Sequence, residues 1–216
     1  MSSIQIVVTK PEHDVVTNYL SDWSNEVIVD AQKLNKGVKE LVHDKANKND
    51  FEKFVKSQKP SFIFLNGHGS PDSVMGHKDE ILVKKDLNEN ILSGSIVYAV
   101  SCESALELGP AAVENGARAY IGYVAPFAFL TNTSSECIPD EDGLAKWFKE
   151  PSNQVPFNIL KGKTAQESHT KSQNKFKELI RKLSSSETIL EAKDVRFWLF
   201  WDMTSQRLLG DPEARM

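Results

Sequence analysis

The chain has 216 residues, of which 40% are hydrophobic and 26% charged, and its formal net charge is −4. These values are typical of one globular domain, expected to span residues 1–216, and they exclude a disordered chain. The mildly acidic balance argues against direct nucleic-acid binding, and no apolar run approaches the roughly 18 residues of a membrane-spanning helix. With no evident signal peptide and only two cysteines, Cys102 and Cys137, the sequence favours a cytoplasmic protein without disulfides.

The first quarter of the chain predicts alternating strands and helices. An apolar run at 4–8 predicts a first strand, and Pro11 with the apolar residues that follow it at helical spacing predicts a helix. Residues 27–29 predict a second strand, and the polar stretch 36–59 is expected to be helical.

Three apolar runs predict the centre of a sheet. They lie at 61–65, 95–100 and 119–122, and a helix is predicted between the last two, over 104–115, with Gly116 as its stop. Runs that are apolar on both faces suit buried strands of a parallel sheet. The sequence therefore predicts an α/β fold with helices on both faces of the sheet.

The second half is less regular. Residues 123–156 give only weak signals, and a long loop inside a domain is often functional. An amphipathic helix is predicted over 163–183 and a further helix over 187–207, with a strand at 195–201 as the alternative.

Two of the buried strands end in residues that can carry chemistry. The first runs into Gly67-His68-Gly69-Ser70 and the second into Ser101-Cys102. Because ligands bind beyond the carboxyl ends of parallel strands, His68 and Cys102 are expected to face one cleft. An imidazole can take the proton of a cysteine nucleophile, and a helix starting after Cys102 would lower the pKa of the thiol. The backbone N–H groups of Gly69 and Cys102 could form an oxyanion hole.

Other interpretations stay open for these residues. A cysteine at a strand end is often a buried small apolar residue, and a histidine between glycines is often a turn residue. A metal site would need His68, His77, Cys102 and an acid to converge, and no ligand-spaced pair supports one, so neither a metal nor another cofactor is expected. His77 is the alternative base, whereas Cys137 lies in a polar loop with no strand to position it.

The two strand-end motifs, in this order, resemble those of the caspase–gingipain clan of cysteine peptidases, which includes caspases, legumains, separases, clostripain, gingipains and CHAT domains. The ending Leu208-Leu209-Gly210-Asp211-Pro212 is similar to that of gingipain-type and CHAT domains, and Val100-Ser101 before the cysteine departs from the caspase branch. The resemblance implies a three-layer α/β/α caspase-like sandwich with a mostly parallel central sheet.

The resemblance also implies roles for individual residues. His68 matches the catalytic histidine, Cys102 the nucleophile, and Gly69 the oxyanion-hole residue, shared with the N–H of Cys102. It implies a cysteine endopeptidase that forms a thioester with a protein or peptide substrate, and an activating ligand or protein partner, as in many members of the clan.

The clan usually lines its substrate pocket from the strand after the cysteine and the loop beyond it, here Tyr123 through Asp142. Asp72 and Glu103 lie beside the catalytic motifs. An acidic residue in the pocket would favour a basic residue in the substrate. The alternative is that 139–143 forms a solvated turn.

Two other functions fit the same motifs. The chain could be a non-catalytic caspase-like binding or regulatory module in a signalling or defence assembly. It could also be an acyl transferase or amidase that uses the same pair. Activity that is lost in Cys102→Ala but kept in Cys137→Ala would separate an enzyme from a binding module.

Overall fold

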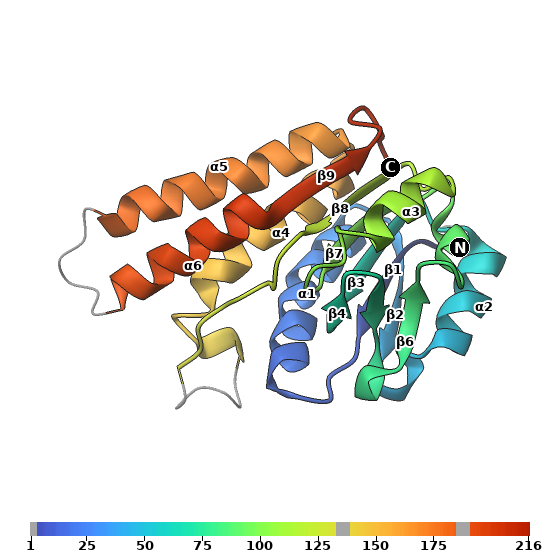
Figure 1. Cartoon of the computed structure of the whole chain (residues 1–216), viewed down its shortest axis with the longest axis horizontal. Coiled ribbons are helices and arrows are strands. Elements are labelled where there is room, and N and C mark those ends of the chain that lie inside the picture. Colours follow the sequence, from blue (N-terminus) through green and yellow to red (C-terminus); the bar gives the residue numbers. More distant parts are fainter. Residues whose placement is uncertain (1–3, 133–138, 185–190) are drawn as a thin grey trace.

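The computed structural model describes residues 4–132, 139–184 and 191–216. Its centre is a six-stranded sheet (Figure 1). The strand order is β2-β1-β3-β7-β8-β9. Neighbouring strands are parallel except for β9, which runs antiparallel to β8 at the edge. The strands are β1 (Ile4–Lys10), β2 (Gly37–Val42), β3 (Phe62–Asn66), β7 (Ile96–Val100), β8 (Ala119–Tyr123) and β9 (Gln206–Gly210).

Helices cover both faces of this sheet. One apolar cluster joins the sheet to α1, α4, α5 and α6, and a second cluster joins its other face to α2 and α3. The helices are α1 (Val15–Lys33), α2 (Lys48–Gln58), α3 (Leu108–Glu114), α4 (Lys146–Leu160), α5 (Ala165–Ser184) and α6 (Ala192–Ser205). The predicted α/β architecture with a mostly parallel sheet is therefore confirmed. Among the described residues, no helix is both long and apolar enough to cross a membrane.

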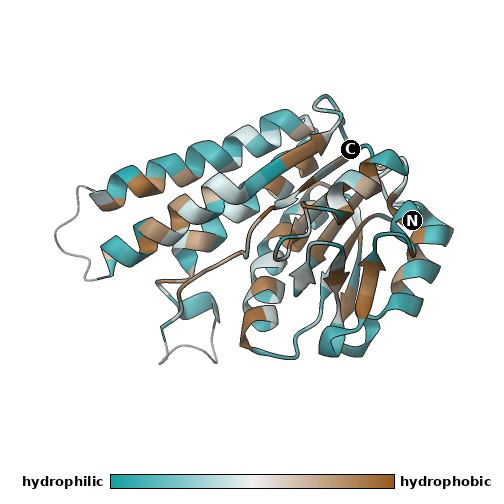
Figure 2. Ribbon diagram, viewed as in Figure 1, coloured by the Kyte–Doolittle hydropathy of each residue, from teal (hydrophilic) through white to brown (hydrophobic). Residues whose placement is uncertain are grey.

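The central strands show why their sequences are apolar throughout. In β3, Phe62 and Phe64 pack into the first cluster, whereas Ile63 and Leu65 pack into the second. Successive side chains of a strand point to opposite faces, so a strand with helices on both sides needs apolar residues at every position. In Figure 2 hydrophobic colour marks strands at the centre of the molecule and also β6, β9 and parts of the helices.

A small antiparallel sheet follows β3 and was not predicted. It consists of β4 (Gly69–Ser70), β5 (Ser73–Met75) and β6 (Ile81–Lys84), in that order. Val74 and Val83 are buried in the cluster that also holds α2 and α3. These strands are two to four residues long, too short for a clear alternating pattern in the sequence.

Two predictions near the N-terminus are wrong. Residues 27–29 belong to α1, where Val27 and Ile28 are buried but Val29 is 46% exposed, which is helical spacing. The stretch 36–59 is not one helix, because its first part forms the edge strand β2 and only its second part forms α2. The helix predicted from Pro11 and the apolar residues after it does form, and it begins at Val15.

Later boundaries also differ from the prediction. The helix expected at 104–115 begins only at Leu108. The region 123–156, where the sequence gives only weak signals of secondary structure, contains most of α4. Pro151 and Pro156 lie inside this helix, and because proline is rare in helix interiors the sequence does not indicate a helix here. The alternative strand at 195–201 is wrong, because these residues lie inside α6. The first residues of the predicted 187–207 helix lie outside the described part of the chain, and its end forms β9.

Candidate active site

The two chemically suggestive strand ends are neighbours. Strands β3 and β7 pair in parallel, with Asn66 opposite Val100. His68 and Cys102 each follow two residues beyond that pair, so the chain brings both to the same edge of the sheet. The hydroxyl of Ser101 donates a hydrogen bond of 3.2 Å to the backbone carbonyl of His68, which ties the two turns together.

Gly69 lies directly against the turn that carries Cys102. A Cβ atom at this position would be 2.0 Å from Oγ of Ser101 and 2.6 Å from the backbone oxygen of Cys102. Both distances are far below van der Waals contact, so the two turns can approach this closely only with glycine at position 69. The two residues predicted to share an oxyanion hole thus have adjacent backbones.

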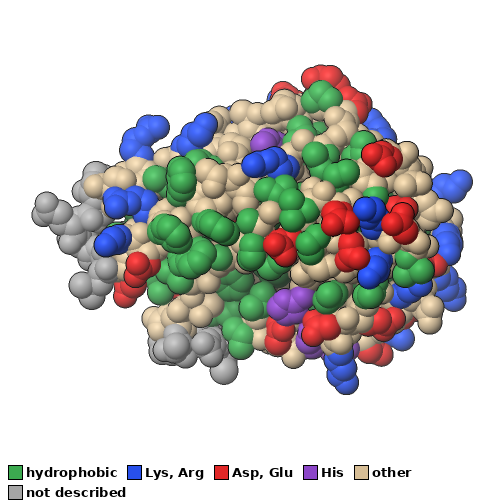
Figure 3. All heavy atoms as spheres, in the orientation of Figure 1, with side chains coloured by type: hydrophobic (Ala, Val, Ile, Leu, Met, Phe, Trp, Pro, Cys, Tyr) green, Lys and Arg blue, Asp and Glu red, His purple; other side chains and the backbone are tan. Residues whose placement is uncertain are grey.

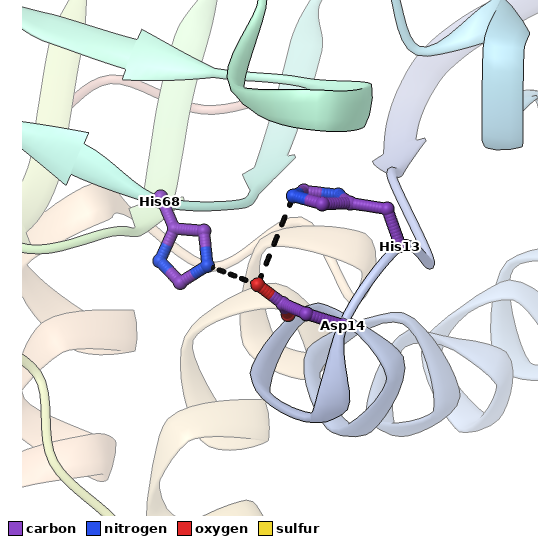
Figure 4. Close-up of side chains that lie close together, drawn as sticks. All are labelled: His13, Asp14 and His68. Carbon is purple, nitrogen blue, oxygen red and sulfur yellow. Dashed lines mark hydrogen bonds and ion pairs between the residues drawn. The ribbon is translucent and has the colours of Figure 1, made fainter.

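Asp14 is an acidic partner of His68 that the sequence motifs do not indicate. Its Oδ2 lies 2.6 Å from Nε2 of His68 (Figure 4). Asp14 is the N-cap of α1, and its Oδ1 accepts a 2.8 Å hydrogen bond from the backbone N–H of Thr17. Both oxygens of the carboxylate are therefore held in place. Because an ionised carboxylate only accepts hydrogen bonds, Nε2 of His68 carries the proton, and Nδ1 is left as the basic nitrogen when the ring is neutral.

The environment keeps Asp14 ionised. Partial burial acts to raise the pKa of Asp14, but hydrogen bonds from His68 and Thr17 outweigh it and lower the pKa to about 2. A signal for this residue exists in the sequence: Asp14 and Thr17 form a capping box at the start of a helix. That signal predicts where the helix begins, but it does not reveal that the other oxygen meets a histidine 54 positions later.

Cys102 rests as a neutral thiol. Burial raises the pKa of Cys102, and the nearby carboxylate of Glu103 raises it further. Its Sγ donates to the backbone carbonyl of Phe127 at 4.0 Å. Within the described residues no hydrogen bond joins Cys102 to His68, a looseness common in enzymes without substrate. The expected help from a helix dipole is absent, because α3 begins six residues after Cys102, at Leu108.

Residues 124–130, here called the strap, run past Cys102 and are held by α6. The indole N–H of Trp201 donates to the carbonyl of Pro126 at 2.8 Å, and Oδ1 of Asp202 accepts from the N–H of Ala128 at 3.1 Å. The ring of Phe127 packs against Tyr123, with centroids 4.8 Å apart. Helix α6 therefore positions the carbonyl that contacts the thiol, a connection that the sequence does not indicate.

The residues predicted to bind substrate lie in different environments. Tyr123 and Asp142 are completely buried, and Asp142 accepts hydrogen bonds from the hydroxyl of Tyr19 and from backbone N–H groups at the start of α4. In this conformation neither can contact a substrate, and Asp142 is a structural acid instead. Asp72 pairs with Lys84 at 3.1 Å, and Glu103 has the left-handed φ of 58° directly beside Cys102.

The other two candidates can be placed in part. His77, the alternative base, donates through Nδ1 to the carbonyl of Pro11 at 2.6 Å and packs beside His13, with ring centroids 5.5 Å apart. Cys137 lies outside the described residues. One group of side chains among the described residues could hold a metal ion, namely His13, Asp14 and His68.

Comparison with known proteins gives no assignment for this site. No protein-family model matches the chain, and no curated protein matches it significantly.

Proposed function

We propose that the protein is a cysteine peptidase of the caspase–gingipain type, with Cys102 as nucleophile, His68 as base and Asp14 as the residue that orients His68. The observation that carries the proposal is the convergence of three separate chain segments beyond the ends of β1, β3 and β7. The ionised Asp14 fixes the ring of His68, and Gly69 closes against the backbone of Cys102. Nucleophile, base and orienting acid are the parts that acyl transfer requires.

The chemistry follows from these positions. Substrate binding displaces the Phe127 carbonyl from the thiol, and the proton of Cys102 passes to Nδ1 of His68. The thiolate attacks the peptide carbonyl, and His68 returns the proton to the leaving amine, which yields a thioester. Water then hydrolyses the thioester with His68 as base. Asp14 stabilises the imidazolium at both stages, because it remains a carboxylate throughout.

Labelling with an acyloxymethyl-ketone probe tests this proposal, because such probes need an activated thiol. We expect the probe to modify Cys102, as located by peptide mapping, and the modification to be lost in Cys102→Ala and strongly slowed in His68→Ala. The matched control is Cys137→Ala, which should label at the wild-type rate. Labelling of Cys102 that is equally fast in His68→Ala, or cleavage of a peptide panel that survives in Cys102→Ala, would refute the assigned roles.

The neutral resting thiol favours a second candidate. A non-catalytic regulatory module with the same fold needs no activated cysteine, and the thiol of Cys102 is occupied by a backbone carbonyl rather than by His68. If the probe modifies Cys102 no faster than it modifies a simple thiol, and no peptide in the panel is cleaved, this second candidate replaces the first.

A further inference from the structure

Side chains with metal-binding atoms gather between the start of α1 and the turn after β3. His13 and Asp14 precede α1, His68 follows β3, and Asp79 lies beyond β5. Donor atoms of His13, Asp14 and His68 all lie within 4.8 Å of one another. Figure 4 shows both imidazole rings directing a nitrogen toward the same carboxylate, and Figure 3 shows histidine and acidic side chains together on this surface.

The spacing of these atoms is close to that of a tetrahedral zinc site. Zinc holds nitrogen and oxygen ligands at about 2.0–2.1 Å, which puts neighbouring ligand atoms roughly 3.3 Å apart. Nε2 of His13 lies 3.7 Å from Oδ2 of Asp14 and 3.3 Å from Oδ1 of Asp79. Nε2 of His68 lies 2.6 Å from Oδ2 of Asp14, so this hydrogen-bonded pair must open to admit an ion. Asp79 lies outside the group of mutually close donor atoms, so its side chain must also move toward the ion.

The side chains are also held and accessible in the way a binding site needs. The side chain of His13 is only 11% exposed, and its ring packs edge-on between those of His68 and His77. Asp14 is fixed by its hydrogen bond from Thr17. In contrast, the side chains of His68 and Asp14 are 33% and 38% exposed, which leaves a route from solvent. Two imidazoles with carboxylates suit zinc and similar transition metals rather than Mg²⁺ or Ca²⁺.

We propose that His13, Asp14 and His68, with Asp79 as a fourth ligand, form a binding site for a divalent transition metal of the zinc class, and that the metal blocks His68 as a base. Zinc bound at Nε2 takes the position of the proton that Asp14 now accepts. That proton moves through solvent to Nδ1, and the nitrogen that should receive the proton of Cys102 becomes a donor. Binding itself is independent of the proposed function, whereas the inhibition rests on it.

Direct binding is the first measurement. Zinc is titrated into the reduced full chain in competition with a chromophoric chelator, for the wild type, His13→Gln and the matched control His43→Gln. His43 is a good control because it is exposed and pairs with Glu12 through its Nε2, outside the proposed ligand set. We expect one site in the wild type and in the control, and binding at least 10-fold weaker in His13→Gln. Equal affinity in the wild type and His13→Gln would overturn the site.

The identity of the ligands is checked with Co²⁺. Imidazole and carboxylate ligands give a visible ligand-field spectrum without the near-ultraviolet charge-transfer band of a thiolate ligand. A thiolate band in the wild type that disappears in Cys102→Ala or Cys137→Ala would place the metal on a cysteine and overturn the proposal. A spectrum that is unchanged in both cysteine variants supports it.

Labelling of Cys102 separates the two proposals. We expect saturating zinc to slow probe labelling of Cys102 in the wild type and in His43→Gln. In His13→Gln the ratio of the labelling rate without zinc to the rate with zinc should be much smaller. Unaltered labelling in a protein that binds zinc at His13 would refute His68 as the base for Cys102 and leave the metal site standing. Absence of binding together with normal labelling would refute the metal site and leave the proposed function standing.

Discussion

Replacing Gly69 by alanine should damage both stability and the reactivity of Cys102. The added Cβ would stand 2.0 Å from Oγ of Ser101, where ordinary contact begins at 3.4 Å, and 2.6 Å from the backbone oxygen of Cys102. The Ser101 side chain can rotate, but it then loses its hydrogen bond to the His68 carbonyl. The oxygen of Cys102 is backbone and cannot rotate away, so the turn itself must shift.

The size of the effect follows from these two contacts. The lost hydrogen bond is worth about 0.5–1.5 kcal/mol, and overpacking of a close contact typically costs about 1–3 kcal/mol. We therefore expect Gly69→Ala to lower the free energy of unfolding by about 1.5–4.5 kcal/mol, or the Tm by roughly 3–18 °C for a domain of this size. Probe labelling of Cys102 should slow by about 10-fold or more, because a misplacement of about 1 Å in a catalytic group is costly.

The measurements are thermal melting and the labelling rate, with Gly143→Ala as the matched control. A Cβ at Gly143 would meet no atom within 4 Å, so that variant should behave as the wild type. The double variant Gly69→Ala with Ser101→Ala relieves only the contact with the serine hydroxyl and should recover part of the stability. If Gly69→Ala melts and labels like Gly143→Ala, the turns of β3 and β7 are not in the contact described.

Three further predictions concern the charges around the site. Asp14→Asn should keep α1 capped, because asparagine is a good N-cap, yet slow labelling of Cys102 by about 10²-fold; an unchanged rate with an unchanged Tm would refute its orienting role. Because burial raises the pKa of Cys102, iodoacetamide labelling of that thiol should still be accelerating above about pH 8.5; a plateau at pH 7 would indicate a preformed thiolate. Burial also raises the pKa of Asp202 well above its usual value, so the unfolded chain ionises this carboxyl while the folded protein keeps it protonated. The free energy of unfolding therefore decreases as pH rises above about 4, because the folded protein cannot ionise this carboxyl. In Asp202→Asn this decrease between about pH 4 and pH 7 should be smaller than in the wild type, as measured by urea titration at each pH.

The central strands could be predicted because they are apolar on both faces. Strand β2 could not, because it is an edge strand: Glu40 pairs with the ammonium of Lys10 and Leu41 is its one buried position. Such a strand has the composition of a solvated helix. The β-branched run at 27–29 was predicted as a strand but is part of a helix. It reads as a strand in isolation, and only its place on a helix that packs against the sheet decides otherwise.

In the candidate site, too, local sequence patterns could be predicted, whereas contacts between distant segments could not. His68 and Cys102 could be proposed because each directly follows a recognisable strand, and position after a strand is a local property. Asp14 could not be assigned, because its role depends on where α1 begins and on how β1 pairs with β3. The side chain of Thr9 sets that relation by accepting from the N–H of Asn66 and donating to its carbonyl, a contact across 57 positions.

One carboxylate therefore links the fold to the chemistry. Oδ1 of Asp14 stabilises the first turn of α1, and Oδ2 holds the ring of His68. Fraying of that first turn would release the ring of His68. The orientation of His68 therefore depends on whether the first turn of α1 is formed. A ligand that pulled Asp14 away from both partners would act on both at once, whereas the proposed metal ion would act on His68 and leave the cap of α1 in place. For this reason the start of α1 is the place where binding can regulate this site without contact with Cys102.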